Sequence, residues 1–229
     1  MFKDATIVFD LDGTLVDTAP DLTNALNDML TLRGHAPVSS EAIRDYVGYG
    51  ARVMIEQALA RAGAQGDVER MLAEFLGYYE ENLARESRPY PGALAALDRL
   101  AAQGATLAIC TNKRERLSRR LLQELEMADY FSAIAGRDTF PVAKPDPGHL
   151  RGVIALAGGD PARSVMIGDS DVDLRTAEAA SIPIILVSFG YGPLPIDRSA
   201  SGGMIDRFDE IEGRAAALLD GGAARVARG

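Results

Sequence analysis

Cysteine is nearly absent from the chain: Cys110 is the single one among 229 residues. An intramolecular disulfide is therefore excluded, and the composition fits a reducing compartment. No apolar run approaches the roughly 20 residues that a helix needs to cross a bilayer. The first nine residues also have no apolar core long enough for a signal peptide. We therefore expect a cytoplasmic protein with no membrane partner.

Basic residues are outnumbered, with 24 Lys and Arg against 33 Asp and Glu, which gives a formal net charge of -9. The densest basic cluster, residues 114–120, has the pattern of a solvated helix face. Because an acidic chain is repelled by nucleic acid, we expect no nucleic acid as a partner. Hydrophobic residues make up 47% of the chain, which is typical of a globular protein with a sizeable core.

Short apolar runs recur along the chain and predict buried strands, at residues 6–9, 106–110, 133–135, 164–167 and 184–187. Segments of helical periodicity lie between them, at residues 92–102, 116–125, 148–157 and 174–180. Strands that alternate with helices indicate a parallel sheet. We therefore expect an α/β fold with a Rossmann-like core and helices on both faces of the sheet.

Residues 20–88 break this alternation, because they hold three or four helical segments and no strand-like run. An all-α cap domain is therefore expected to be inserted after the first strand. The predicted domains are a core at 1–16 and 89–220, a cap at 17–88, and a flexible tail at 221–229. Hinges are expected near residues 15–20 and at the Pro- and Gly-containing stretch 89–92.

Four polar segments follow predicted strands or lie in a loop: Asp10 to Asp17, Thr111 to Lys113, Lys144-Pro145, and Gly168 to Asp173. Ligands of open α/β sheets bind at the carboxyl ends of the strands, so these segments can meet in one crevice. Carboxylates crowded there would repel one another. A hard divalent cation such as Mg2+ relieves the repulsion, while a lysine, a hydroxyl and loop amides can hold a phosphoryl group.

The pattern Asp-x-Asp-Gly-Thr-Leu-x-Asp, followed by Thr-Asn-Lys, Lys-Pro and Gly-Asp-Ser-x-x-Asp, resembles the haloacid dehalogenase superfamily of phosphohydrolases. The resemblance extends from residue 7 to about residue 187 and includes the inserted cap. Within the superfamily, segments 17–22, 47–51, 111–113 and 189–192 look like the bacterial phosphoglycolate phosphatases. The implied enzyme is a phosphoric monoester hydrolase. The implied substrate is a small phosphorylated metabolite, and 2-phosphoglycolate is the leading candidate.

The resemblance implies that Asp10 is the nucleophile, which forms an aspartyl phosphate. Asp12 would protonate the leaving group and then deprotonate the hydrolytic water. Mg2+ would be held by the Asp10 carboxylate, the Asp12 main-chain carbonyl and Asp169. Asp173 would be either a further ligand or a support for the metal and for Lys144.

The resemblance also implies a binding site for the phosphoryl group. Thr111 would bind one of its oxygens, aided by amides of Asn112 and of the Gly13 region, and Lys144 would neutralise its charge. By contrast, the residue types alone favour a solvated Lys113 and a surface His149. Arg44 or Arg52 could pair with a substrate carboxylate, although their residue type and position favour solvated helix faces.

The sequence leaves several alternatives open. The same core could serve another sugar or nucleotide phosphate, or a phosphomutase; a dehalogenase fits less well, because Asp12 suits protonation of a phosphate leaving group. A receiver-like phosphoacceptor module belongs to a different class, but it has no cap and no Asp two residues after its phosphorylated Asp. A catalytically dead binding protein is disfavoured because every required side chain is present. The expected assembly is a monomer or a homodimer.

Overall fold

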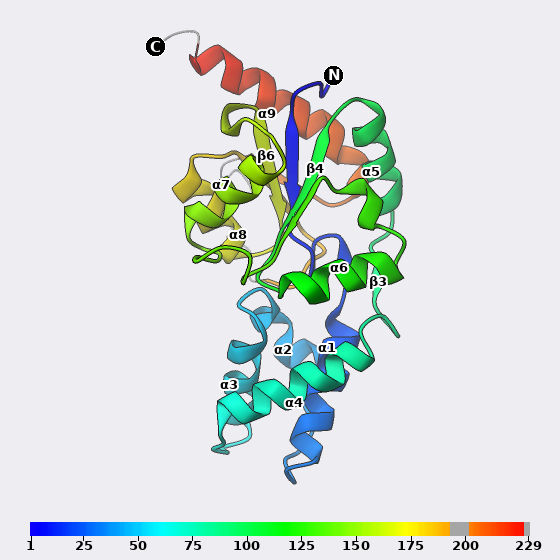
Figure 1. The fold of residues 1–229 in the computed structure, drawn as a ribbon, viewed down its shortest axis with the longest axis vertical. Helices are drawn as coiled ribbons and strands as arrows, with labels where there is room; N and C mark the ends of the chain where they lie inside the picture. Colours follow the sequence, from blue (N-terminus) through cyan, green and yellow to red (C-terminus); the bar gives the residue numbers. More distant parts are fainter. Residues whose placement is uncertain (193–201, 227–229) are drawn as a thin grey trace.

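The computed structural model describes residues 1–192 and 202–226 of the chain. It has two lobes, which Figure 1 shows one above the other. The upper one, here the sheet lobe, contains a sheet flanked by helices. The lower one, here the helical lobe, consists of the four helices α1 to α4. The chain begins in the sheet lobe, enters the helical lobe after its first strand, and then returns.

Six parallel strands form the main sheet, in the order β5-β4-β1-β6-β7-β8. Their bounds are β1 Thr6–Phe9, β4 Thr106–Cys110, β5 Ala133–Ala135, β6 Ser164–Gly168, β7 Ile184–Val187 and β8 Met204–Ile205. The central strand β1 pairs with both β4 and β6, so that Phe9 lies opposite Ile109 and Ile167. Strands that are buried on both faces need a continuous apolar sequence, so the apolar runs in the sequence predict these strands. Strand β8 had no such signal.

Helices cover both faces of this sheet: α5 Ala93–Ala102, α6 Glu115–Glu124, α7 Pro147–Leu156, α8 Asp171–Ala180 and α9 Ile211–Val226. Successive side chains of a strand point to opposite faces. Accordingly, Ile7 and Phe9 pack in one apolar cluster with residues of α5, α6 and α9, whereas Val8 packs in another with residues of α7 and α8. The predicted α/β class, with a parallel sheet between helices, is confirmed.

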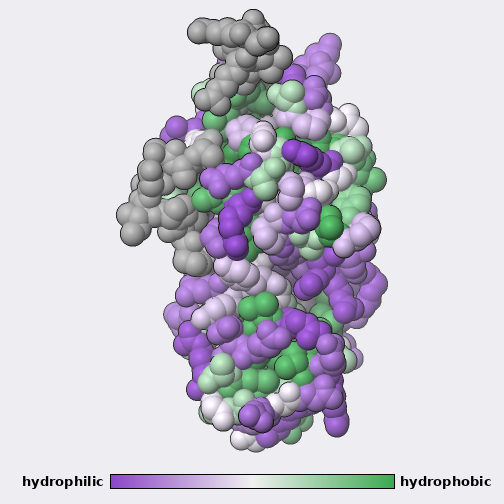
Figure 2. Space-filling view, turned by 90° about the vertical axis from the view of Figure 1, so that its left-hand side faces the viewer, coloured by the Kyte–Doolittle hydropathy of each residue, from purple (hydrophilic) through white to green (hydrophobic). Residues whose placement is uncertain are grey.

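The helical lobe comprises α1 Ala19–Thr31, α2 Ser40–Val47, α3 Ala51–Arg61 and α4 Val68–Glu81. Their apolar residues recur at helical spacing and are buried against one another, among them Leu26, Met29, Ile55 and Phe75. Figure 2 shows hydrophobic surface on this lobe, in the lower part of the view, ringed by hydrophilic residues. A small helical unit cannot bury all of its apolar surface, so such exposure is expected.

Two short strands connect the lobes, β2 (Val16–Asp17) and β3 (Arg88–Pro89), which pair antiparallel. The buried Asp21 carboxylate reinforces this connection. It accepts hydrogen bonds from Ser87 N at 2.8 Å and Ser87 Oγ at 2.7 Å, and from Glu86 N at 3.0 Å. The two crossings between the lobes are thus joined to each other. Among the described helices, none is long and apolar enough to span a membrane.

Candidate active site

Three carboxylates meet at the carboxyl edge of the sheet. Asp10 follows β1, Asp169 follows the adjacent parallel strand β6, and Asp173 lies in the first turn of α8. One oxygen from each lies within 4.8 Å of the others, and all three side chains are buried. The polar segments at 10–12 and 169–173 therefore come together, as their positions after neighbouring parallel strands lead one to expect.

Lys144 lies among these acids. Its Nζ is 2.8 Å from Asp10 Oδ1 and 2.6 Å from Asp173 Oδ1, and its side chain is only 2% exposed. The loop that carries it is fixed by His149, because Lys144 N donates to His149 Nδ1 at 3.2 Å. Burial and the Lys144 charge lower the pKa of His149 to about 4, so the ring is neutral and free to accept this bond. The prediction of a surface His149 was wrong: it is fully buried.

Asp169 is held by two donors to which the sequence analysis gave no role, although both lie in segments that carry the family resemblance. Thr14 Oγ1 donates to Oδ1 at 2.8 Å, and Tyr191 N donates to Oδ2 at 2.8 Å. The chain at Gly13 also passes very close, since a Cβ there would lie 2.4 Å from Asp169 Oδ2. Gly13 has a φ of +85°, so both its conformation and the space require glycine.

Asp173 has a donor on each of its oxygens. Oδ1 accepts from Lys144, while Oδ2 accepts from Ser170 Oγ at 2.6 Å and from the amides of Asp169 and Ser170 at 3.2 Å. Together with the bond from Asp173 N to Ser170 Oγ, these contacts form a capping box at the start of α8. Asp173 therefore supports the loop that carries Asp169.

The charge balance of this group favours a cation. Burial, opposed by Lys144 but reinforced by Asp173 and Asp169, raises the pKa of Asp10 to about 8. Burial and Asp173 likewise raise the pKa of Asp169 to about 6. One ammonium faces three carboxylates, so the cluster is under-compensated when all three are ionised. Clustered carboxylate oxygens of this kind fit a hard divalent cation.

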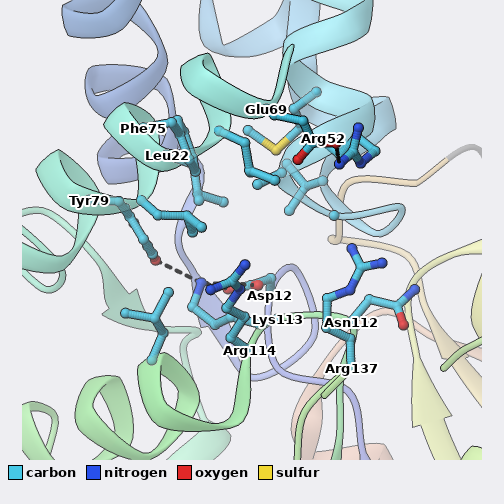
Figure 3. Close-up of a pocket in the computed structure, with 17 residues that line it drawn as sticks. Asp12, Leu22, Arg52, Glu69, Phe75, Tyr79, Asn112, Lys113, Arg114 and Arg137 are labelled. Carbon is cyan, nitrogen blue, oxygen red and sulfur yellow. Dashed lines mark hydrogen bonds and ion pairs between the residues drawn. The ribbon is translucent and has the colours of Figure 1, made fainter. Parts of the chain in front are cut away.

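Asp12 takes part in a separate network on the side that faces the helical lobe. Its Oδ1 accepts from Thr18 Oγ1 at 2.8 Å, and Lys113 Nζ lies 3.0 and 3.2 Å from its two oxygens. Lys113 Nζ also donates to the hydroxyl of Tyr79, on α4, at 2.7 Å. Figure 3 shows Asp12 and Lys113 of the sheet lobe beside Tyr79 of the helical lobe.

The prediction of a solvated Lys113 was wrong, because its side chain is only 4% exposed. Its neighbours in sequence suggested a basic, solvated helix face. One sequence signal did point the other way. Only three of the 24 basic residues are lysine, at positions 3, 113 and 144, although arginine is plentiful. Two of those three, Lys113 and Lys144, are buried beside Asp12 and Asp10.

Thr111 and Asn112 follow β4 at the same edge of the sheet. Thr111 is buried, and its Oγ1 accepts from Lys113 N at 3.1 Å. Asn112 Nδ2 donates to Gly48 O in the helical lobe and to Lys144 O in the sheet lobe, each at 3.1 Å. The Asn112 side chain therefore joins the lobes, an arrangement that the sequence pattern did not reveal.

A cavity of about 250 Å³ lies between the lobes directly over Asp12 and Lys113. Its wall on the helical-lobe side is largely apolar: Leu22, Val47, Met54, Leu72, Phe75 and Leu76. Arg52 also lines it and is paired with Glu69. Arg114 and Arg137 line it from the sheet lobe, and within the described residues neither guanidinium has an ion-pair partner.

Comparison with known proteins identifies the family to which this fold belongs. The family model for haloacid dehalogenase-like hydrolases matches residues 7–187, which is most of the chain and includes Asp10, Lys144 and Asp169. The chain belongs to this hydrolase family. The resemblance inferred from the motifs is thereby confirmed.

Individual relatives of this hydrolase are similar over nearly their whole length. A phosphoglycolate phosphatase of Mesorhizobium japonicum is 47% identical over 208 residues, covering 90% of this chain and 92% of its own. One of Agrobacterium fabrum is 45% identical, with 88% of each chain covered. The crystal structure of a predicted phosphoglycolate phosphatase from Haemophilus somnus superposes with a TM-score of 0.86 at 29% identity, over 93% of this chain and 98% of that one.

Proposed function

We propose that the chain is a Mg2+-dependent phosphatase that cleaves a small phosphomonoester through an aspartyl-phosphate intermediate. Its enzyme class, phosphoric monoester hydrolase, follows from its family and relatives. The observation that carries the mechanism is the contact of Asp10 with Lys144 inside the cluster that it forms with Asp169. A buried carboxylate beside an ammonium and a candidate cation site is suited to attack an anionic phosphoryl group.

In the first step, a carboxylate oxygen of Asp10 attacks phosphorus and the bond from phosphorus to the ester oxygen breaks. Asp12 gives its proton to that oxygen, so that an alcohol leaves and an aspartyl phosphate remains. Lys144 neutralises the nucleophile before attack and the phosphoryl oxygens during transfer. Mg2+, held by the Asp10 and Asp169 carboxylates and the Asp12 carbonyl, would supply further positive charge at this point. Asp173 orients Lys144 and the Asp169 loop.

In the second step, Asp12 takes a proton from water, and the resulting hydroxide oxygen attacks phosphorus. The bond to Asp10 breaks, which frees the carboxylate and releases inorganic phosphate. Thr111 Oγ1 and the amides near Gly13 and Asn112 would hold the phosphoryl oxygens through both steps. The side-chain amide of Asn112 is engaged between the lobes, so its contribution comes from the main chain.

The proposed substrate is 2-phosphoglycolate. The names of the relatives support it, and so does the chemistry of the cavity. A substrate with a carboxylate on its leaving group presents a second anion, and Arg114 and Arg137 offer cations at the cavity. Arg137 reaches toward the helical lobe, since its Nη1 lies 3.1 Å from the place that a Cβ of Gly50 would take. A small apolar-walled space suits a short carbon chain.

Phosphate release over a panel of phosphomonoesters with Mg2+ tests this proposal. The informative pair is 2-phosphoglycolate and ethyl phosphate, which differ by the carboxylate. We expect kcat/KM to favour 2-phosphoglycolate by more than about tenfold, equivalent to roughly 1.4 kcal/mol. A smaller ratio would leave the phosphatase mechanism standing but remove this substrate. Isomer formation without phosphate release would indicate a mutase instead, and a long-lived phosphoprotein without turnover would indicate a phosphoacceptor module.

A further inference from the structure

We propose that Lys113 is a positioning residue for Asp12, and that Tyr79 anchors it from the helical lobe. The inference rests on the proposed function, because it assigns Asp12 the transfer of protons to the leaving group and from water. It concerns how that carboxyl group is held. Lys113 itself touches neither the nucleophile nor, by this proposal, the phosphoryl group.

The contacts around Lys113 Nζ are close and buried. Both oxygens of Asp12 lie within hydrogen-bond distance, at 3.0 and 3.2 Å, and the hydroxyl of Tyr79 lies at 2.7 Å. The side chains of Lys113 and Asp12 are 4% and 11% exposed. An ammonium so placed is retained only with close partners, since burying an unpaired charge is costly. The Asp12 carboxylate is therefore held by hydrogen bonds from both Lys113 and Thr18.

Tyr79 connects this pair to the helical lobe. Besides its hydroxyl contact, its ring centroid lies 4.5 Å from Lys113 Nζ, a cation–π distance. The ring itself stacks on Phe75, one turn earlier on α4, with centroids 5.9 Å apart. The position of Asp12 is thus coupled to α4 through a single lysine, although Asp12 belongs to the sheet lobe.

The nature of the leaving group gives a way to separate positioning from mere structural support. An alkoxide is a poor leaving group and needs the proton of Asp12, whereas a nitrophenolate leaves without one. A residue that acts through Asp12 must therefore matter for an alkyl phosphate and much less for p-nitrophenyl phosphate. A residue that only maintains the fold would lower both rates alike.

The experiment compares Lys113→Met with wild type in single-turnover formation of the phosphoenzyme, using 2-phosphoglycolate and p-nitrophenyl phosphate. We expect the variant to be slower by roughly 10²-fold with the alkyl substrate, the size of a general-acid contribution. With the aryl substrate, the loss should stay below about threefold. Tyr79→Phe keeps the ring and removes the hydroxyl, so it should show the same pattern at about threefold to tenfold.

Matched controls come from the same chain. Tyr78→Phe removes a hydroxyl from the neighbouring position of α4, and Lys3→Met removes an exposed lysine; both should leave the two rates unchanged. Equal losses on both substrates in Lys113→Met and Tyr79→Phe, or no loss in either, would overturn the proposal. If Lys113→Met does not fold, the ratio of the two rates in Tyr79→Phe decides. A wild-type enzyme that forms no phosphoenzyme would instead refute the proposed function.

Discussion

Two buried lysines face the aspartates of this hydrolase, and their surroundings differ. Lys144 contacts Asp10 and Asp173, which both belong to the sheet lobe, and its loop is held by His149 of the same lobe. Lys113 contacts Asp12 from the sheet lobe and Tyr79 from the helical lobe. The proposed phosphoryl end of the site therefore lies within one lobe, whereas the proposed leaving-group end is shared between two.

This difference has a chemical consequence. The phosphoryl group is common to all phosphomonoesters, so the residues that attack it can be fixed on rigid strand ends. The leaving group distinguishes one substrate from another, and in the proposed mechanism it meets the cavity, which residues of the helical lobe partly line. Changes at the first end should thus affect all substrates equally. Changes at the second should depend on the substrate.

The largest effect is expected at the nucleophile. Asp10→Asn replaces the attacking carboxylate by an amide with little change of shape, so turnover should fall by roughly 10⁴–10⁶-fold, the range for loss of a covalent nucleophile. The loss should be the same for every phosphomonoester, as measured by phosphate release and by the absence of a phosphoenzyme. An Asp10→Asn enzyme with full activity would refute the assignment of the nucleophile.

Asp12→Asn should sharpen the contrast between the two ends. Loss of the acid and base is expected to lower turnover by roughly 10²–10⁴-fold, yet Asp10 can still be phosphorylated. Rapid-quench measurements should therefore find residual phosphoenzyme formation with slow release of phosphate. Formation should suffer less with p-nitrophenyl phosphate than with an alkyl phosphate. Identical losses on the two substrates would contradict the role of Asp12 at the leaving group.

A smaller and more selective effect is expected at the cavity. Arg137→Met removes a guanidinium that is proposed to meet the substrate carboxylate, so KM for 2-phosphoglycolate should rise by about tenfold with little change in kcat. KM for ethyl phosphate should change less than about twofold. Arg163→Met, at the opposite end of β6, serves as the control and should alter neither. A parallel rise for both substrates would exclude carboxylate recognition by Arg137.

The smallest effect concerns stability and tests the cation site alone. The pKa values of Asp10 and Asp169, raised from 3.8 to about 8 and about 6, mean that the folded state binds more protons than the unfolded one. Without a divalent cation, stability should therefore fall as the pH rises from about 4 to about 8. Mg2+ favours the ionised carboxylates, so its stabilisation should be greater at pH 8 than at pH 5.

Thermal unfolding with Mg2+ and with a chelator measures this difference. Saturating Mg2+ should raise Tm by roughly 5 °C at pH 8 and by less at pH 5. Asp169→Asn removes one of the proposed ligands and should abolish most of the shift. A Tm shift that is equal at both pH values, or that persists in Asp169→Asn, would locate the cation elsewhere.

Much of the fold and of the carboxylate cluster could be predicted because the relevant signals are local. A buried strand needs an apolar run, and the polar residues directly after it lie at its carboxyl end. Asp10 and Asp169 follow adjacent parallel strands, so their proximity follows from the topology. Thr14 and Tyr191 lie in segments that carry the family resemblance, but their contacts with Asp169 could not be predicted, because these contacts span 155 and 22 positions of the chain.

The errors at Lys113 and His149 have one physical cause. The prediction for each residue depends on its sequence neighbours alone, whereas burial depends on which distant residues pack against it. Lys113 is paired with an aspartate 101 positions away and a tyrosine 34 positions away. Sequence periodicity carries no information about such distant partners. The scarcity of lysine in the chain does indicate that some of its few lysines have specific roles.

The sequence by itself determined the alternation of strands and helices, the helical insertion after β1, and the placing of carboxylates at strand ends, since these depend on local periodicity and on the direction of parallel strands. The tertiary structure alone decided which charge meets which partner. Asp12 is paired with Lys113 rather than with the Lys144 cluster, and Tyr79 of the helical lobe contacts that buried lysine. Removing a charge from water is costly unless an opposite charge lies close to it. Which charges are removed from water depends on the packing of the whole chain, so local sequence cannot specify their partners.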